Sequence, residues 1–204
     1  MAEERVFFES GGLKIEGLLE SLHSDRGVVI THPHPLYGGD MFNNVVEAIV
    51  QAYREKGHST LRFNFRGVGQ SEGDYDNGIG EQENVRAALG YLSDLGKRNI
   101  DLAGYSFGAW VNALGLESFE KATRMIMVSP PVNFIDFSFL TYDQKIQLVI
   151  VGTEDDIAGF KMVEGMLQTW NPEANLRNIR GADHFYWGKI SELKSIIHEF
   201  LSST

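Results

Sequence analysis

The pentapeptide Gly-Tyr-Ser-Phe-Gly at residues 104–108 constrains the fold of this chain more than any other stretch. Before it, residues 100–103 form a short, mostly apolar run of the kind expected for a buried parallel strand. After it, residues 109–117 can continue as a helix. Gly-x-Ser-x-Gly between a strand and a helix is the pattern of a nucleophile elbow, in which the serine occupies a tight, strained turn. A side chain at either glycine would crowd the neighbouring strand or helix.

Strand and helix patterns alternate from residue 27 onward, which predicts an α/β fold with an open, mostly parallel sheet and helices on both faces. Further strands are expected at 27–31, 59–65, 125–128, 147–151 and 175–179, and further helices at 43–56, 80–95 and 189–201. At the start of the chain, strands at 5–9 and 13–20 flank Ser-Gly-Gly, a signal for an antiparallel hairpin. Without an internal repeat or linker, residues 1–204 are expected to form one domain.

Two loops after later strands hold candidate partners for Ser106. Asp155 follows the strand expected at 147–151, and His184 follows the strand expected at 175–179. Loops after parallel strands converge on one rim of the sheet, so these three residues are predicted to meet there. Glu154 and Asp156 compete with Asp155 as the acid, and Asp155 is preferred.

Each residue type suits one step of nucleophilic catalysis. A serine hydroxyl becomes a strong nucleophile when an imidazole such as His184 removes its proton, and a carboxylate holds that imidazole in the right tautomer. A tetrahedral oxyanion then needs two N–H donors. Phe107 N–H, directly after the serine, is one candidate. The second is expected from the loop after residues 27–31, with His34 N–H preferred and Leu36 N–H the alternative, because proline 33 has no N–H.

Composition narrows the function classes. The formal net charge of −10 argues against nucleic acid or an anionic membrane as a partner. The chain has no cysteine, which excludes disulfides, thiolate metal sites and a cysteine nucleophile. The N-terminal residues have no uninterrupted apolar core, so no signal peptide or membrane anchor is expected and a cytoplasmic location is predicted.

The remaining polar residues are expected to have structural roles. His32 and His34 resemble a metal-binding pair, but prolines hold them in an extended run and no third ligand is evident, so no metal is predicted. His58 is expected in a surface turn. Asp101 interrupts a strand pattern, which suggests an edge position or a partner such as Arg98.

Four motifs in this order resemble the α/β-hydrolase superfamily over almost the whole chain. They are His-Pro-His-Pro-Leu-Tyr-Gly-Gly at 32–39, Arg-Phe-Asn-Phe-Arg-Gly-Val-Gly at 62–69, the pentapeptide at 104–108 and Gly-Ala-Asp-His-Phe at 181–185. More narrowly, the chain is similar to small bacterial hydrolases related to dienelactone hydrolases and short-chain carboxylesterases. The resemblance implies Ser106 as nucleophile, Asp155 as acid and His184 as base. It departs from the commonest pattern at 32–33, where His-Pro replaces His-Gly.

The segment at 129–146 bears on substrate choice. It is too short for the cap domain that lipases usually insert there. Phe134 and Phe137 in this segment are candidates to line a shallow acyl pocket, although core packing explains them equally well. Tyr37 and Tyr105, which flank the predicted site, are also candidate substrate contacts. A site without a lid favours small or mobile soluble esters.

The expected function is that of a cofactor-independent serine hydrolase that cleaves a small carboxylic ester or thioester through an acyl-enzyme. The motifs do not separate this activity from that of a dienelactone-type lactonase or an acyl-peptide hydrolase. A catalytically idle hydrolase fold that serves as a binding module is the alternative from another class. The oligomeric state stays open, and a homodimer is among the options.

Overall fold

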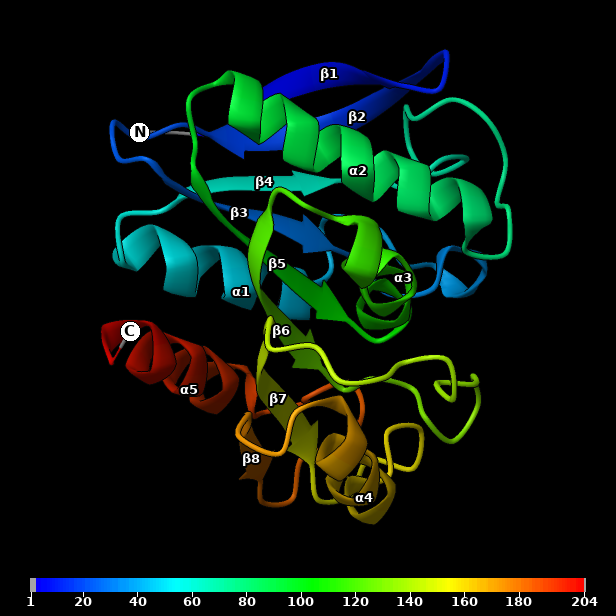
Figure 1. Ribbon diagram of the computed structural model, residues 1–204, viewed down its shortest axis with the longest axis vertical. Coiled ribbons are helices and arrows are strands. Elements are labelled where there is room, and N and C mark those ends of the chain that lie inside the picture. The colour runs from blue at the N-terminus through cyan, green and yellow to red at the C-terminus, as the bar shows by residue number, and fades with distance from the viewer. Residues whose placement is uncertain (1–2, 204) are drawn as a thin grey trace.

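One central sheet organises residues 3–203, the part of the chain that this computed structural model describes (Figure 1). Its eight strands are β1 (Glu4–Ser10), β2 (Leu13–Glu20), β3 (Arg26–Thr31), β4 (Ser59–Phe63), β5 (Asn99–Tyr105), β6 (Ala122–Val128), β7 (Ile146–Gly152) and β8 (Asn175–Ile179). Their order in the sheet is β1-β2-β4-β3-β5-β6-β7-β8. The hairpin β1–β2 pairs antiparallel and joins β4 antiparallel, whereas all other pairs are parallel. The predicted fold class is confirmed.

Helices cover both faces of this sheet (Figure 1). They are α1 (Asn44–Glu55), α2 (Ile79–Asp94), α3 (Phe107–Gly115), α4 (Phe160–Trp170) and α5 (Ile190–Ser202), with short 3-10 helices η1 (Pro35–Tyr37) and η2 (Leu116–Ser118). Helices α1 and α5 share one core layer, and α2, α3 and α4 pack in the layers on the other face. Helix α4 was not among the helices predicted from the sequence, although Val163, Leu167 and Trp170 bury one of its sides.

The two core layers follow the period-two alternation of the strands. In β3, Val28 and Ile30 point toward α1 and α5, while Val29 between them points to the opposite layer. Each of these three side chains is fully buried. Because both faces are covered, the central strands read as continuous apolar runs instead of alternating ones. The parallel arrangement then brings the carboxyl ends of β3, β5, β6, β7 and β8 to one rim.

Asp101 is buried in the middle of this sheet, which corrects the expected edge position and the expected partner Arg98. Strand β5 lies between β3 and β6. The carboxylate accepts hydrogen bonds from Tyr53 Oη at 2.9 Å and from Arg124 Nε at 3.0 Å. Burial, together with the negative charge of Asp101, raises the pKa of Tyr53 well above its usual value. His58 is also buried, with its ring edge-on to Tyr53, and not in the expected surface turn.

The connection between β6 and β7 carries no inserted cap. Residues 129–145 contain neither a helix nor a strand. The rim above β5 is therefore left open by this segment, as the length of the segment predicted. Among residues 3–203, no helix combines the length and the apolar character needed to cross a membrane.

Candidate active site

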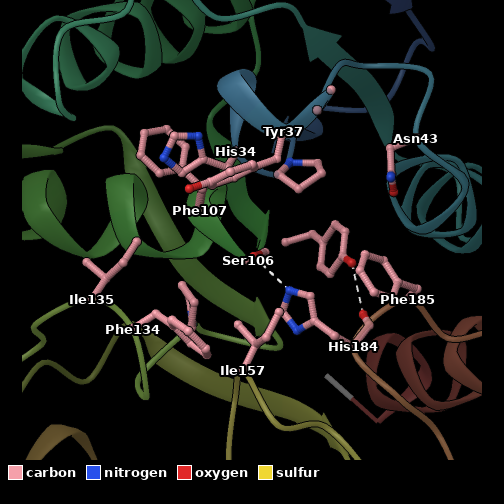
Figure 2. Close-up of a pocket in the computed structure, with 15 residues that line it drawn as sticks. His34, Tyr37, Asn43, Ser106, Phe107, Phe134, Ile135, Ile157, His184 and Phe185 are labelled. Carbon is pink, nitrogen blue, oxygen red and sulfur yellow. Dashed lines mark hydrogen bonds between the residues drawn. The ribbon is translucent and has the colours of Figure 1, made fainter.

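Ser106 occupies a strained turn between β5 and α3. Its backbone has φ 54° and ψ −119°, a conformation that residues with a side chain rarely adopt. Its own N–H donates to Val128 O at the end of β6, at 2.9 Å. Backbone strain of this kind persists only where the surrounding structure enforces it, and it gathers at functional sites. In Figure 2, a dashed line joins Ser106 to the imidazole of His184.

The two glycines of the pentapeptide are required for steric reasons, as the sequence predicted. A Cβ at Gly104 would lie 2.6 Å from Ala109 N in helix α3. A Cβ at Gly108 would lie 2.6 Å from Thr31 O at the end of β3. Both distances are far below van der Waals contact with backbone atoms, which cannot move aside. The glycines thus allow α3 to approach β3 and β5 closely enough to place Ser106.

We expect Gly104→Ala and Gly108→Ala each to lower the free energy of unfolding by about 2 kcal/mol or more, as overpacking of a tight core does. Gly165→Ala is the matched control, because Gly165 lies in helix α4 with no atom near its missing Cβ. Alanine there should stabilise the protein by about 1 kcal/mol through helix propensity. Urea unfolding of the three variants measures this contrast. Equal stability of all three would contradict the steric requirement.

A continuous hydrogen-bonded line joins Ser106, His184 and Asp155. His184 Nε2 lies 2.9 Å from Ser106 Oγ, and His184 Nδ1 lies 3.0 Å from both carboxylate oxygens of Asp155. All three side chains are buried or nearly so, and each comes from a loop after a different strand. Glu154 and Asp156 are exposed and do not share this contact with the imidazole. The structure therefore brings together the three residues that the sequence placed at one rim.

Asp155 is held as an acceptor by donors on both of its oxygens. Ile157 N–H and Ala158 N–H donate to Oδ1 at 2.9 and 2.7 Å, and Ser129 Oγ donates to Oδ2 at 2.7 Å. Burial alone would raise the pKa of the Asp155 carboxyl, but the bonds from His184, Ser129 and Ala158 outweigh it and hold this pKa below its usual value. An ionised Asp155 keeps the proton of the imidazole on Nδ1 and leaves Nε2 free to accept from Ser106.

Two backbone N–H groups near Ser106 are left without a protein acceptor among the described residues. They belong to Phe107, the first residue of α3, and to His34. The side-chain rings of these two residues are in contact, with centroids 4.6 Å apart. Leu36 N–H, by contrast, donates to His34 Nδ1 at 3.2 Å within η1. Leu36 N–H, the alternative candidate for the second oxyanion donor, is therefore already used in a hydrogen bond. Figure 2 shows His34 and Phe107 on the same side of Ser106.

The serine opens into a cavity of about 610 Å³. Of residues 3–203, no lysine, arginine, aspartate or glutamate lines this cavity. The lining residues are Pro33, His34, Tyr37, Gly38, Gly39, Asn43, Tyr105, Ser106, Phe107, Pro131, Phe134, Ile135, Ile157, His184 and Phe185. In Figure 2, His34, Tyr37 and Phe107 lie on one side of Ser106, and Phe134, Ile135 and Ile157 lie on the other. Sequence reasoning missed Asn43, Ile135, Ile157 and Phe185 as cavity residues.

The four aromatic residues expected to contact substrate separate into three groups. Tyr37 and Phe134 line the cavity and are strongly exposed at its mouth. Phe137 does not line the cavity, which corrects its expected place: it is buried in the core against Trp170, with ring centroids 5.3 Å apart. Tyr105 touches the cavity, but its hydroxyl donates to the backbone oxygen of His184 at 2.9 Å. Tyr105 therefore ties the loop of His184 to strand β5.

His32 is fully buried and both of its ring nitrogens are engaged. Nδ1 lies 2.7 Å from Pro33 O, and Nε2 accepts from Phe65 N–H at 3.0 Å. Burial lowers its pKa to about 4, so the ring is neutral and carries its proton on Nδ1. His32 thus braces the loop that carries His34. Among residues 3–203, no group of three or more histidine, aspartate or glutamate side chains is arranged to hold a metal ion.

Comparisons with known proteins point to one superfamily, although no family model matches the chain. The uncharacterized protein RP471 of Rickettsia prowazekii is 32% identical and aligns with 97% of this chain and 88% of its own length. An alpha-beta serine hydrolase homologue from Coxiella burnetii superimposes with a TM-score of 0.90 at 33% identity over 98% of both chains. XC6422 from Xanthomonas campestris, an α/β serine hydrolase without lid, has a TM-score of 0.89 at 27% identity, covering 100% of this chain and 95% of its own. With this fold and these relatives, the chain belongs to the α/β-hydrolase superfamily.

Proposed function

We propose that the protein is a serine hydrolase that cleaves a small, uncharged carboxylic ester or thioester through an acyl-enzyme. The observation that carries this proposal is the line from Ser106 Oγ through His184 to Asp155, with contacts of 2.9 and 3.0 Å at the floor of an open cavity. Such a constellation activates a serine hydroxyl, which is otherwise a weak nucleophile.

The proposed first step transfers the acyl group to the enzyme. Ser106 Oγ attacks the carbonyl carbon while His184 Nε2 takes the hydroxyl proton, and Asp155 stabilises the resulting imidazolium. The carbonyl oxygen becomes an oxyanion, which the N–H groups of Phe107 and His34 would bind. Each such donor contributes roughly 2.7–4 kcal/mol to the transition state. The bond to the leaving oxygen or sulfur then breaks, and His184 returns the proton to that atom.

The second step reverses these roles with water. His184 Nε2 removes a proton from a water molecule, whose oxygen attacks the acyl carbon of the Ser106 ester. The tetrahedral intermediate collapses, the carboxylic acid leaves, and His184 gives the proton back to Ser106 Oγ. No cofactor enters this sequence, because every proton and electron pair is supplied by the three side chains, the substrate and water.

The cavity supports an uncharged and compact substrate. Its lining residues include no aspartate, glutamate, lysine or arginine to neutralise a charged substrate group, and burying an unpaired charge there would be costly. A volume of about 610 Å³ lies within the range of small-ligand sites. Because residues 129–145 leave the mouth open, the leaving alcohol or thiol can extend into solvent.

Labelling with a fluorophosphonate probe, followed by peptide mapping, tests this proposal. The probe reacts with a serine only when a base activates it, so folded wild-type protein is expected to carry the adduct on Ser106. The His184→Ala variant, which removes the base, and heat-unfolded wild-type protein are expected to stay unlabelled. Wild-type protein that labels should also hydrolyse p-nitrophenyl acetate or butyrate.

An unlabelled but folded wild-type protein would contradict the hydrolase proposal. The result would favour the binding-module alternative, in which the fold is kept without its chemistry. A lactonase or an acyl-peptide hydrolase would instead label at Ser106 and prefer lactones or acylated peptides over simple esters. Rates on these three substrate types therefore separate the enzyme alternatives.

A further inference from the structure

The hydrogen-bonded line that begins at Ser106 does not end at Asp155. Ser129 comes directly after β6, and its Oγ lies 2.7 Å from Asp155 Oδ2. The same Oγ lies 2.7 Å from Tyr186 Oη. An ionised carboxylate only accepts hydrogen bonds, so the single hydroxyl proton of Ser129 goes to Asp155. Tyr186 must then donate its own proton to Ser129 Oγ. Both outer members of the line are completely buried.

Backbone strain is concentrated in this same line. Among the described residues, four that are not glycine have positive φ: Asn77 at 52°, Ser106 at 54°, Ser129 at 45° and Tyr186 at 57°. Three of the four belong to the line, and only Asn77 lies outside it. A bulky residue such as tyrosine rarely adopts this conformation. Strain at three members of one network indicates that the surrounding structure enforces their placement.

The contacts of Ser129 and Tyr186 tie three strands to the acid. Ser129 N–H donates to Ile150 O in β7 at 2.8 Å, which fixes the turn after β6 against the neighbouring strand. Tyr186 lies in the loop after β8, only two positions beyond His184, and its hydroxyl also approaches Ile150 O at 3.4 Å. The network therefore spans the ends of β6, β7 and β8, where the acid and the base must meet.

The two oxygens of Asp155 are held by different parts of the structure. Oδ1 accepts from Ile157 N–H and Ala158 N–H, both in the same loop as Asp155. Besides His184, the only described residue that donates to Oδ2 is Ser129. Without Ser129, the carboxylate would be anchored on one side only and could turn away from the imidazole.

We propose that Ser129 and Tyr186 are positioning residues that lock the carboxylate of Asp155 toward His184, an inference that rests on the hydrolase function proposed above. Neither side chain lines the cavity, so neither is placed to touch substrate. Ser129 orients the carboxylate directly. Tyr186 acts one step further back, because it fixes the direction in which the Ser129 hydroxyl points.

The protonation states agree with these directions. The hydrogen bond from Ser129 is one of the causes that lower the pKa of Asp155 and keep it ionised. Burial raises the pKa of Tyr186 well above its usual value and outweighs the hydrogen bond with Ser129, which lowers this pKa; the negative charge of Asp155 raises it further. Tyr186 thus keeps its proton as a donor at neutral pH.

Steady-state kinetics of Ser129→Ala on an uncharged p-nitrophenyl ester tests this inference. We expect kcat to fall roughly 10-fold, the usual cost of losing a hydrogen bond to a charged group, while KM changes little. Tyr186→Phe should show a smaller loss in kcat, again with KM preserved. A purely structural role would instead lower stability and leave kcat of the folded fraction unchanged.

Two variants separate the effect of losing the Ser129 hydroxyl from the effect of relieving backbone strain. Ser129→Gly relaxes the left-handed backbone and removes the hydroxyl, so it should fold well and still lose kcat as Ser129→Ala does. Asn77→Gly relaxes the same kind of strain outside the line and is expected to keep wild-type kcat. Full kcat in Ser129→Gly would overturn the positioning role of Ser129.

A proton NMR measurement tests the inference without any turnover. The Nδ1–H of His184, hydrogen-bonded to a carboxylate, should give a strongly downfield resonance, which is assigned by its loss in His184→Ala. In Ser129→Ala and Ser129→Gly this resonance is expected to move upfield or broaden as the acid loosens. An unchanged resonance in both variants would overturn the inference even if the wild-type protein is an active hydrolase. Failure of the hydrolase function itself would appear separately, as an unlabelled wild-type Ser106.

Discussion

Ser106→Ala is expected to reduce turnover by a factor on the order of 10⁴ or more, because removing the nucleophile leaves only binding and the oxyanion donors. The fold should be retained, since alanine keeps the Cβ and, within residues 3–203, the hydroxyl is bonded only to His184. Hydrolysis of a p-nitrophenyl ester and thermal unfolding, measured on the same preparation, give both results. This variant tests the largest single contribution to the proposed chemistry.

Ser138→Ala is a suitable control for that experiment. Ser138 is an exposed serine in the connection between β6 and β7, and its one hydrogen-bond partner in the described part of the chain is nearby Asp136. Its loss should leave both turnover and unfolding temperature close to the wild-type values. A Ser106→Ala protein that retains most of the wild-type esterase rate would refute the assignment of the nucleophile.

Asp155→Asn is expected to lower kcat by roughly 10⁴-fold, as the loss of the carboxylate that orients a catalytic imidazole does elsewhere. An amide can turn its NH₂ toward His184 and stabilise the wrong tautomer, in which Nε2 carries the proton. The amide also cannot accept all the donors that surround it, namely Ser129 Oγ and the N–H groups of Ile157 and Ala158. A moderate loss of stability should therefore accompany the loss of activity.

The neighbouring acid supplies the matched variant. Asp156→Asn makes the same chemical change one residue away, on an exposed side chain that, within residues 3–203, is not a hydrogen-bond or ion-pair partner of the His184 ring. We expect its kcat and stability to stay close to wild type. Measuring kcat for both variants ranks the two acids. A larger loss of kcat in Asp156→Asn than in Asp155→Asn would assign the role of the triad acid to Asp156 instead.

Much of the fold follows from local patterns that the sequence displays directly. Apolar runs bounded by turn residues located every strand of the sheet, and their alternation with helices implied a mostly parallel sheet covered on both faces. Helix α4 was not predicted because it has few buried positions, and exposed residues separate them. These positions are Val163, Leu167 and Trp170. A short helix with a narrow apolar side produces a weak periodic signal, and its burial depends on the β7 face that it covers.

The sequence predicted the burial of individual side chains less well than it predicted the strands and helices. Phe134 and Phe137 stand three positions apart in one loop, yet one lies at the cavity mouth and the other packs against Trp170 in the core. Asp101 pairs with Arg124 and Tyr53, which come from a neighbouring strand and from helix α1. Loops and strand neighbours bring such partners together only after the chain has folded.

The chemical identity of the candidate site was determined by the sequence, because the tight turn at Ser106 and the order of Asp155 and His184 depend on local glycines and on strand ends. The outer part of the hydrogen-bonded line was decided by tertiary structure alone. Ser129 and Tyr186 are 57 positions apart, and neither belongs to a motif that would mark it. Their contact exists because β6, β7 and β8 are neighbours in the sheet, which places the ends of these strands at the same rim. Side-chain direction at that rim is set by packing between distant segments, and no local pattern encodes it.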